Sequence, residues 1–173
     1  MPTYYLDFAN QIISYLGLDN EVNENVNKLI KKLPFHVKIY GVRVIIPQIS
    51  FGETLSELYF KFKNIKGKEF TFYGLETKIS EILNLINKMQ ADLKPPTWEA
   101  ISVYNTLRSE DSFLADKVGP VDLLILSQAI SDPSADHLFT TDMTLIDSQT
   151  TNVVKNQIKK YKEEGGFTIT DYI

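Results

Sequence analysis

Hydrophobic and polar positions along the chain follow two periods, one helical and one extended. Apolar residues recur every three or four positions, which predicts amphipathic helices, in the segments 8–16, 22–33, 49–62, 79–89 and 153–161. Runs rich in apolar, aromatic or β-branched residues predict strands at 3–6, 36–47, 67–74, 138–141 and 167–172. Pro34 is expected to end the second helix, because proline lacks the N–H that a helix interior needs.

Two further segments are expected to be helical. Residues 95–107 open on a proline, which the first turn of a helix tolerates. Residues 121–130 form an apolar run that periodicity alone does not assign, and Gln128 and Ala129 favour a helix over a strand. Helices and strands therefore alternate along the whole chain.

This alternation predicts the fold class. Several strands, such as the run Val44–Ile46, are apolar without alternation, which is typical of parallel strands covered on both faces. We expect an α/β protein with three layers, α/β/α, around a mainly parallel, twisted sheet. The chain shows no internal repeat and no Ser/Gly-rich linker, so a single domain over residues 1–173 is expected.

Two acidic residues follow predicted strands directly. Asp7 comes after Tyr4–Leu6, and Asp142 comes after the segment 138–141. Ligands of parallel sheets bind at the carboxyl ends of the strands, where the strand order reverses. Asp7 and Asp142 are therefore expected to line one crevice.

Two more acids belong to the same pattern. Glu53 lies in the first turns of the helix 49–62, and Asp122 lies at the start of the apolar helix 121–130, where it could simply stabilise the helix N-terminus. Several carboxylates in one crevice repel one another unless a cation neutralises them. Mg²⁺ and Mn²⁺ prefer oxygen ligands, so the pattern predicts a divalent-metal pocket.

Composition restricts the class of protein. The chain is 43% hydrophobic and 23% charged, which is ordinary for a packed globular domain. Its net charge of −4 argues against binding nucleic acid through a broad basic face, but not against an enzyme whose acids hold metal ions. No cysteine is present, and no apolar run approaches the roughly 20 residues that span a bilayer. A soluble, cytoplasmic protein is expected.

Four stretches together resemble the PIN domain, a family of small metal-dependent nucleases. In order along the chain they are YYLDFANQII, VIIPQISFGETLSEL, VGPVDLLILSQAI and HLFTTDMTLI. Each is similar to a family motif that carries one acid, and the resemblance covers nearly the whole chain. It implies a single PIN-like domain, with a family-divergent insertion around residues 94–117.

The sequence also departs from the family pattern. Ala9 stands where the family often has a small hydroxyl or amide residue two positions after the first acid. Glu57 lies one turn beyond Glu53 on the same helix face, so the identity of the second acid stays open. The spacing from Pro47 favours Glu53.

The resemblance implies a function and a set of roles. Asp7, Asp122 and Asp142 would hold one or two Mg²⁺ or Mn²⁺ ions directly or through water, and Glu53 would bind metal or orient a water. The expected activity is that of an endoribonuclease, which hydrolyses RNA phosphodiester bonds with a metal-activated water. The protein would act as a toxin with an antitoxin-like protein partner, or in RNA processing. A homodimer through the apolar helix around 51–62 is also expected.

Three other functions agree less well with the sequence than a nuclease does. A non-catalytic PIN-like module that binds RNA or protein would have no reason to keep four mutually repelling acids. A phosphotransfer receiver domain would need a second acid beside Asp7, which the sequence lacks. A phosphate-loop hydrolase would need a Gly-rich loop with a lysine after a strand, and none is present.

Several other residues have a functional and a structural interpretation. The hydroxyls of Thr140, Thr141 and Ser127 could position a water or phosphate, although strand propensity alone explains the threonines. Trp98 could stack on a base but is expected to anchor its helix in the core. Asp147 could be a further acid behind the metal ligands but is expected to cap the following helix. Arg108 and Lys117 are expected to contact phosphate. His36 and His137 are far apart in the sequence, so a histidine-based metal site is not expected.

Overall fold

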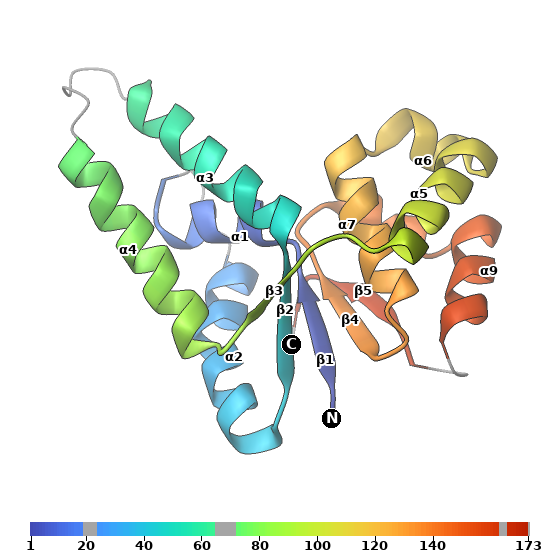
Figure 1. The fold of residues 1–173 in the computed structure, drawn as a ribbon, viewed down its shortest axis with the longest axis horizontal. Coiled ribbons are helices and arrows are strands. Elements are labelled where there is room, and N and C mark those ends of the chain that lie inside the picture. The colour runs from blue at the N-terminus through green and yellow to red at the C-terminus, as the bar shows by residue number, and fades with distance from the viewer. Residues whose placement is uncertain (19–23, 65–71, 163–165, 173) are drawn as a thin grey trace.

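The computed structural model describes residues 1–18, 24–64, 72–162 and 166–172. In these ranges five strands form one sheet in the order β3-β2-β1-β4-β5, and every neighbouring pair is parallel (Figure 1). The strands are β1 (Thr3–Leu6), β2 (Arg43–Pro47), β3 (Asp92–Lys94), β4 (Ala135–Phe139) and β5 (Thr168–Thr170). The predicted α/β fold with a parallel sheet is confirmed.

Helices cover both faces of the sheet (Figure 1). On one side lie α1 (Phe8–Tyr15), α2 (Glu24–Tyr40), α3 (Gln48–Lys63) and α4 (Phe72–Lys88). On the other lie α5 (Trp98–Glu110), α6 (Ser112–Lys117), α7 (Pro120–Ser131) and α9 (Asn152–Tyr161), and the short α8 (Met143–Ser148) packs with this group. In the described ranges, no helix is long and apolar enough to cross a membrane.

Each central strand supplies side chains to two separate cores. Tyr5, Ile45 and Leu138 are buried against α5, α7 and α9. Their chain neighbours Leu6, Ile46 and Phe139 are buried against α1–α4. Successive strand residues point to opposite faces, so a strand with helices on both sides must be apolar at every position. This is why these strands lack polar–apolar alternation.

The second helix is longer than the sequence predicted. The expected stop at Pro34 is wrong, because α2 continues to Tyr40, and the predicted strand 36–47 is present only as β2 from Arg43. The helix is buried through Val26, Leu29, Ile30 and Leu33 before the proline, and Val37 after it packs against the same core. The stop is Gly41, whose φ of 64° is a left-handed conformation that favours glycine.

Other differences concern short elements. The expected strand 67–74 lies partly outside the described residues, and its end is wrong because α4 starts at Phe72. The strand expected at 138–141 runs from Ala135 to Phe139, so Thr140 and Thr141 follow it. The segment 94–117, expected to be an insertion, forms the end of β3 followed by α5 and α6. β3, α6 and α8 have six residues or fewer, too few to show a period.

A side-chain amide closes the outer edge of the sheet at β5. Gln149 Nε2 donates to the Ile169 carbonyl at 3.1 Å, and the Ile169 N–H donates to Gln149 Oε1 at 3.3 Å. Gln149 lies at the end of α8, so that short helix is held against the edge strand.

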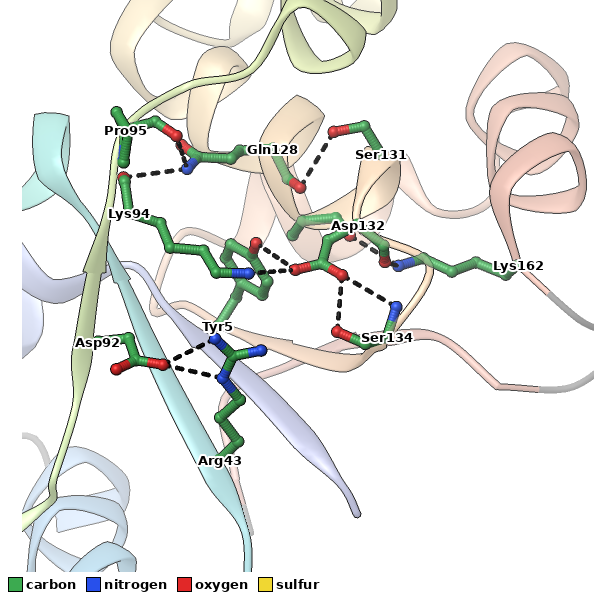
Figure 2. Close-up of polar contacts among 11 residues, drawn as sticks. Tyr5, Arg43, Asp92, Lys94, Pro95, Gln128, Ser131, Asp132, Ser134 and Lys162 are labelled. Atoms are coloured by element: carbon green, nitrogen blue, oxygen red, sulfur yellow. Dashed lines mark hydrogen bonds and ion pairs between the residues drawn. The ribbon is translucent and has the colours of Figure 1, made fainter.

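A polar network ties the sheet to its helices at the C-terminal end of α7 (Figure 2). The Asp132 carboxylate accepts hydrogen bonds from Tyr5 Oη at 2.7 Å, from Lys94 Nζ at 3.0 Å, and from the N–H and hydroxyl of Ser134. Lys162 donates to the carbonyl of Asp132. Burial alone would raise the pKa of Asp132, but these hydrogen bonds outweigh it and hold the pKa below its usual range. The network therefore joins β1, β3, α7 and the residue after α9.

Candidate metal centre

The strand order places a binding site between β1 and β4. From β1 the chain moves to β2 and then β3 on one side, and it returns to the other side of β1 for β4 and β5. This reversal is the topological switch point at which parallel sheets bind ligands, outside the carboxyl ends of the strands. Asp7 directly follows β1, and the segment Thr140–Asp142 directly follows β4.

Asp7 is buried with half of its carboxylate unused. Its backbone N–H donates to the Phe139 carbonyl at 2.9 Å, which continues the pairing of β1 with β4. The side chain is 1% exposed, and Oδ2 accepts a hydrogen bond from Thr140 Oγ1 at 2.7 Å. Oδ1 is buried and has no hydrogen-bond partner within the described residues. A buried acceptor without a partner destabilises the fold, so this oxygen fits a positively charged ligand.

Electrostatics show that the four predicted acids lie near one another. Burial raises the pKa of Asp7 to about 7, against the lowering effect of the Thr140 hydrogen bond. The negative charges of Asp122, Glu53 and Asp142 also contribute to this rise, each less than burial does. We call Asp7, Glu53, Asp122 and Asp142 the acid cluster.

Glu53 and Asp122 come from helices on opposite faces of the sheet. Glu53, half-buried on α3, has a pKa raised by burial and then by the charges of Asp122 and Glu57. Asp122, half-buried in the first turn of α7, has a pKa raised by burial and then by Asp142, while its own backbone N–H lowers it. Glu57 is exposed and is not among the groups that shift the pKa of Asp7. Glu53, unlike Glu57, is therefore one of the charges that act on Asp7.

Asp142 begins the short helix α8. Its Oδ1 accepts a hydrogen bond from the Thr144 N–H at 2.7 Å, so the side chain caps this helix. Its own N–H donates to Thr140 Oγ1 at 3.0 Å. The buried Thr140 hydroxyl therefore accepts from Asp142 and donates to Asp7. Strand propensity does not explain Thr140, because it lies past β4 and its hydroxyl connects two acids.

The carboxylates of the acid cluster do not converge on one point in this structure. Among the described residues, no three acidic or histidine side chains converge closely enough to hold one ion. Charge repulsion acts over longer separations than coordination, which needs oxygens about 2.0–2.6 Å from the ion. The four carboxylates are thus near enough to shift pKa values but not arranged as a closed shell. The unpartnered Asp7 Oδ1 is the feature that fits a divalent cation.

Two other expectations are wrong. Trp98 does not anchor α5 in the core, because its side chain is 82% exposed. Asp147 does not cap α9, since Thr151 occupies the N-cap and accepts from the Val154 N–H. Asp147 lies inside α8 instead.

The remaining candidates lie outside the acid cluster or are engaged elsewhere. Ser127 donates within its own helix to the Leu123 carbonyl at 2.7 Å. Arg108 donates to the Ala115 carbonyl at 3.0 Å, which stabilises the turn between α5 and α6. His36 and His137, far apart in sequence, line one cavity of about 610 Å³ on the β4–β5 face. Periodicity could not show that Thr140 matters, because its signal is a contact between segments 133 residues apart.

Comparison with known proteins supports the fold. No protein-family model and no curated protein matches the sequence. Among solved structures, a chain in the crystal structure of VapBC2 from Rickettsia felis, bound to a DNA fragment from their promoter, superposes with a TM-score of 0.56. The match covers 96% of each chain at 18% sequence identity. At this identity the similarity shows a shared fold and does not establish an activity.

Proposed function

We propose that this protein is a PIN-like, metal-dependent endoribonuclease, which hydrolyses RNA phosphodiester bonds at the acid cluster. The buried Asp7, at the switch point of the sheet with one carboxylate oxygen unpartnered, carries the proposal. The order of the four acid motifs and the fold shared with a VapBC2 chain support it. Folding buries the Asp7 carboxylate near three other carboxylates, which is unfavourable without a cation. A reaction that depends on a bound cation explains why these acids are placed together.

The residues have distinct roles on this proposal. Asp7 Oδ1, Asp122 and Asp142 hold Mg²⁺ or Mn²⁺, and Glu53 binds the ion or orients a water. Thr140 positions Asp7 by donating to Oδ2, which leaves Oδ1 for the ion. When bound, such an ion supplies an activated water and positive charge for the oxyanion that develops at phosphorus. No protein nucleophile is required, in keeping with a chain that has no cysteine.

The test is cleavage of a labelled RNA mixture with Mg²⁺, with Mn²⁺ or with chelator, beside the Asp142→Asn variant. Asparagine is as good an N-cap as aspartate, so this variant keeps the cap of α8 and removes one charge. We expect metal-dependent cutting by the wild type and a loss of at least about 100-fold in the variant. If RNA binds but is not cut under any of these conditions, the result would contradict the nuclease and support a non-catalytic binding module.

The structural match also suggests a partner. The fold is shared with a VapBC2 chain, and we propose that this chain acts as a toxin restrained by an antitoxin-like protein in the cytoplasm. Expression of the wild-type chain alone should stop cell growth, and the Asp142→Asn variant should not. Equal growth with both proteins, while the wild type still cuts RNA in vitro, would favour RNA processing.

A further inference from the structure

A second feature lies beside the acid cluster: an apolar hollow of about 370 Å³ between α3, α5 and α7. Its walls include Ile49, Ile101, Tyr104, Asn105, Val121 and Leu124. No charged side chain lines it among the described residues. Tyr104 is the aromatic residue of the lining, and the exposed Asn105 amide is a polar group with both a donor and an acceptor. Such a space fits an uncharged, flat group that has a polar edge.

The hollow shares two walls with the acid cluster. On α7, the wall residue Val121 directly precedes Asp122. On α3, the wall residue Ile49 lies four positions before Glu53, and residues with that spacing are neighbours on one helix face. The charges of Glu53 and Asp122 act on each other across the gap between these helices. A group held in the hollow is therefore adjacent to a phosphate held at the acids.

The third wall, α5, carries an exposed tryptophan on the same face. Trp98 is 82% exposed, and Ile101 and Asn105 follow it at spacings of three and seven residues, which places all three on one side of the helix. The distance along the helix from Trp98 to Asn105 is about 10 Å. Burying such a ring gains free energy, yet no described residue covers it.

We propose that this face of α5, together with the hollow, is a base-binding surface for single-stranded RNA. One base enters the hollow, where Tyr104 contacts its face and Asn105 hydrogen-bonds to its edge. A neighbouring base stacks on Trp98, as bases do on the aromatic side chains of proteins that bind single strands. The inference rests on the proposed nuclease function and adds to it the residues that select the cleavage site.

Trp98 itself supplies the measurement, because it is the only tryptophan in the chain. Its fluorescence should be quenched by short oligomers of A, C, G or U in the presence of chelator, where metal-dependent cutting cannot occur. We expect one base to bind most tightly. Asn105→Ala should reduce the preference among bases about tenfold or more, and Ile101→Glu, which puts a negative charge into the hollow, should weaken all four.

The matched control is Phe35→Ala, an exposed aromatic residue near the end of α2. This variant should bind every oligomer like the wild type. Thermal unfolding of each variant, followed by circular dichroism, checks that the substituted positions leave the fold intact.

The result separates the base-binding surface from the nuclease. Cutting of RNA without any quenching of Trp98 fluorescence would contradict the base-binding surface and support the nuclease function. Quenching with the expected base preference, but no cutting with any metal, would support the base-binding surface and contradict the nuclease function. A shift of Trp98 emission with protein concentration alone, matched by a dimer on size-exclusion chromatography, would assign this face to a second copy and overturn the proposal.

Discussion

At the scale of single residues, Thr140 determines how the acid cluster is arranged. Its hydroxyl has one proton, which goes to Asp7 Oδ2, and its oxygen accepts from the Asp142 N–H. Only a hydroxyl of this size can serve both groups at once. The residue therefore fixes which oxygen of Asp7 remains for a ligand.

Thr140→Val tests this role. The substitution keeps the shape of the side chain but leaves Asp7 Oδ2 and the Asp142 N–H unpaired, so the free energy of unfolding should fall by about 1–3 kcal/mol. Urea unfolding measures this change. Thr140→Ser keeps the hydroxyl and should lose much less. If serine and valine destabilise equally, the effect comes from the methyl group and not from the hydrogen bonds.

Asp7 should make stability depend on pH. Its pKa is near 3.8 in the unfolded chain and about 7 in the folded protein. Because the folded state disfavours the charged form, the metal-free protein loses stability as pH rises from about 4 to 7. Asp7→Asn removes this loss, so at pH 8 the variant should be more stable than the wild type, by on the order of 1–4 kcal/mol.

Urea unfolding in chelator, at a series of pH values, measures the difference between the wild type and Asp7→Asn. The exposed Asp116→Asn, outside the acid cluster, is the control for removing one carboxylate. An Asp7→Asn variant that is less stable than the wild type at every pH would show that the carboxylate is structural. Mg²⁺ should stabilise the wild type more than the variant, because a ligand that binds only the folded state raises its stability.

At the scale of elements, glycine conformation explains where α2 stops. Gly41 has a φ of 64°, and a Cβ there would meet nothing within 4 Å, so Gly41→Ala tests backbone strain alone. It should cost about 1 kcal/mol. Gly52, inside α3, has ordinary helical backbone and equally open space. Gly52→Ala should therefore stabilise the protein by about 0.5–1 kcal/mol. Thermal unfolding of the two variants should give shifts of opposite sign.

The helices that the sequence predicted are the longer ones, and the two that it missed, α6 and α8, have six residues each. Long helices such as α3, α4 and α9 have an apolar face that repeats over several turns. The predicted start of β2 is too early, because Pro34 indicates a helix end that does not occur. α2 instead continues to Tyr40, and Gly41 follows it. β3 was missed because a three-residue edge strand with an exposed Asp92 has no apolar signal.

At the scale of the whole molecule, the acids could be predicted but their surroundings could not. A strand that ends on an acid is visible in one short segment, and a parallel sheet brings such ends together. The exposure of Trp98 depends instead on how α5 packs against α7, which the sequence of its first turn does not reveal. In the Asp132 network, the bonded residues Tyr5 and Asp132 lie 127 positions apart, so no local pattern predicts it.

That network should make Asp132 important for stability. Asp132→Ala leaves the Tyr5 hydroxyl and the Lys94 ammonium without their acceptor, so unfolding free energy at pH 7 should fall by about 2–4 kcal/mol. The low pKa of Asp132 means that its contribution is present above about pH 4 and is lost as pH falls further. Urea unfolding at pH 7 and pH 3 should show the wild type and variant converging in acid. If the difference in unfolding free energy between the two proteins is the same at both pH values, the effect comes from packing and not from the charge of Asp132.

The amide of Gln149 has a consequence for the behaviour of the protein at high concentration. An edge strand offers unpaired peptide groups on which a strand of another molecule can add, and this is a common route to aggregation. On β5, the peptide groups of Ile169 are already bonded to a side chain of the same molecule. A strand approaching this edge would first have to displace Gln149. The Gln149 amide thus protects this edge at Ile169 from pairing with a strand of another copy of the chain.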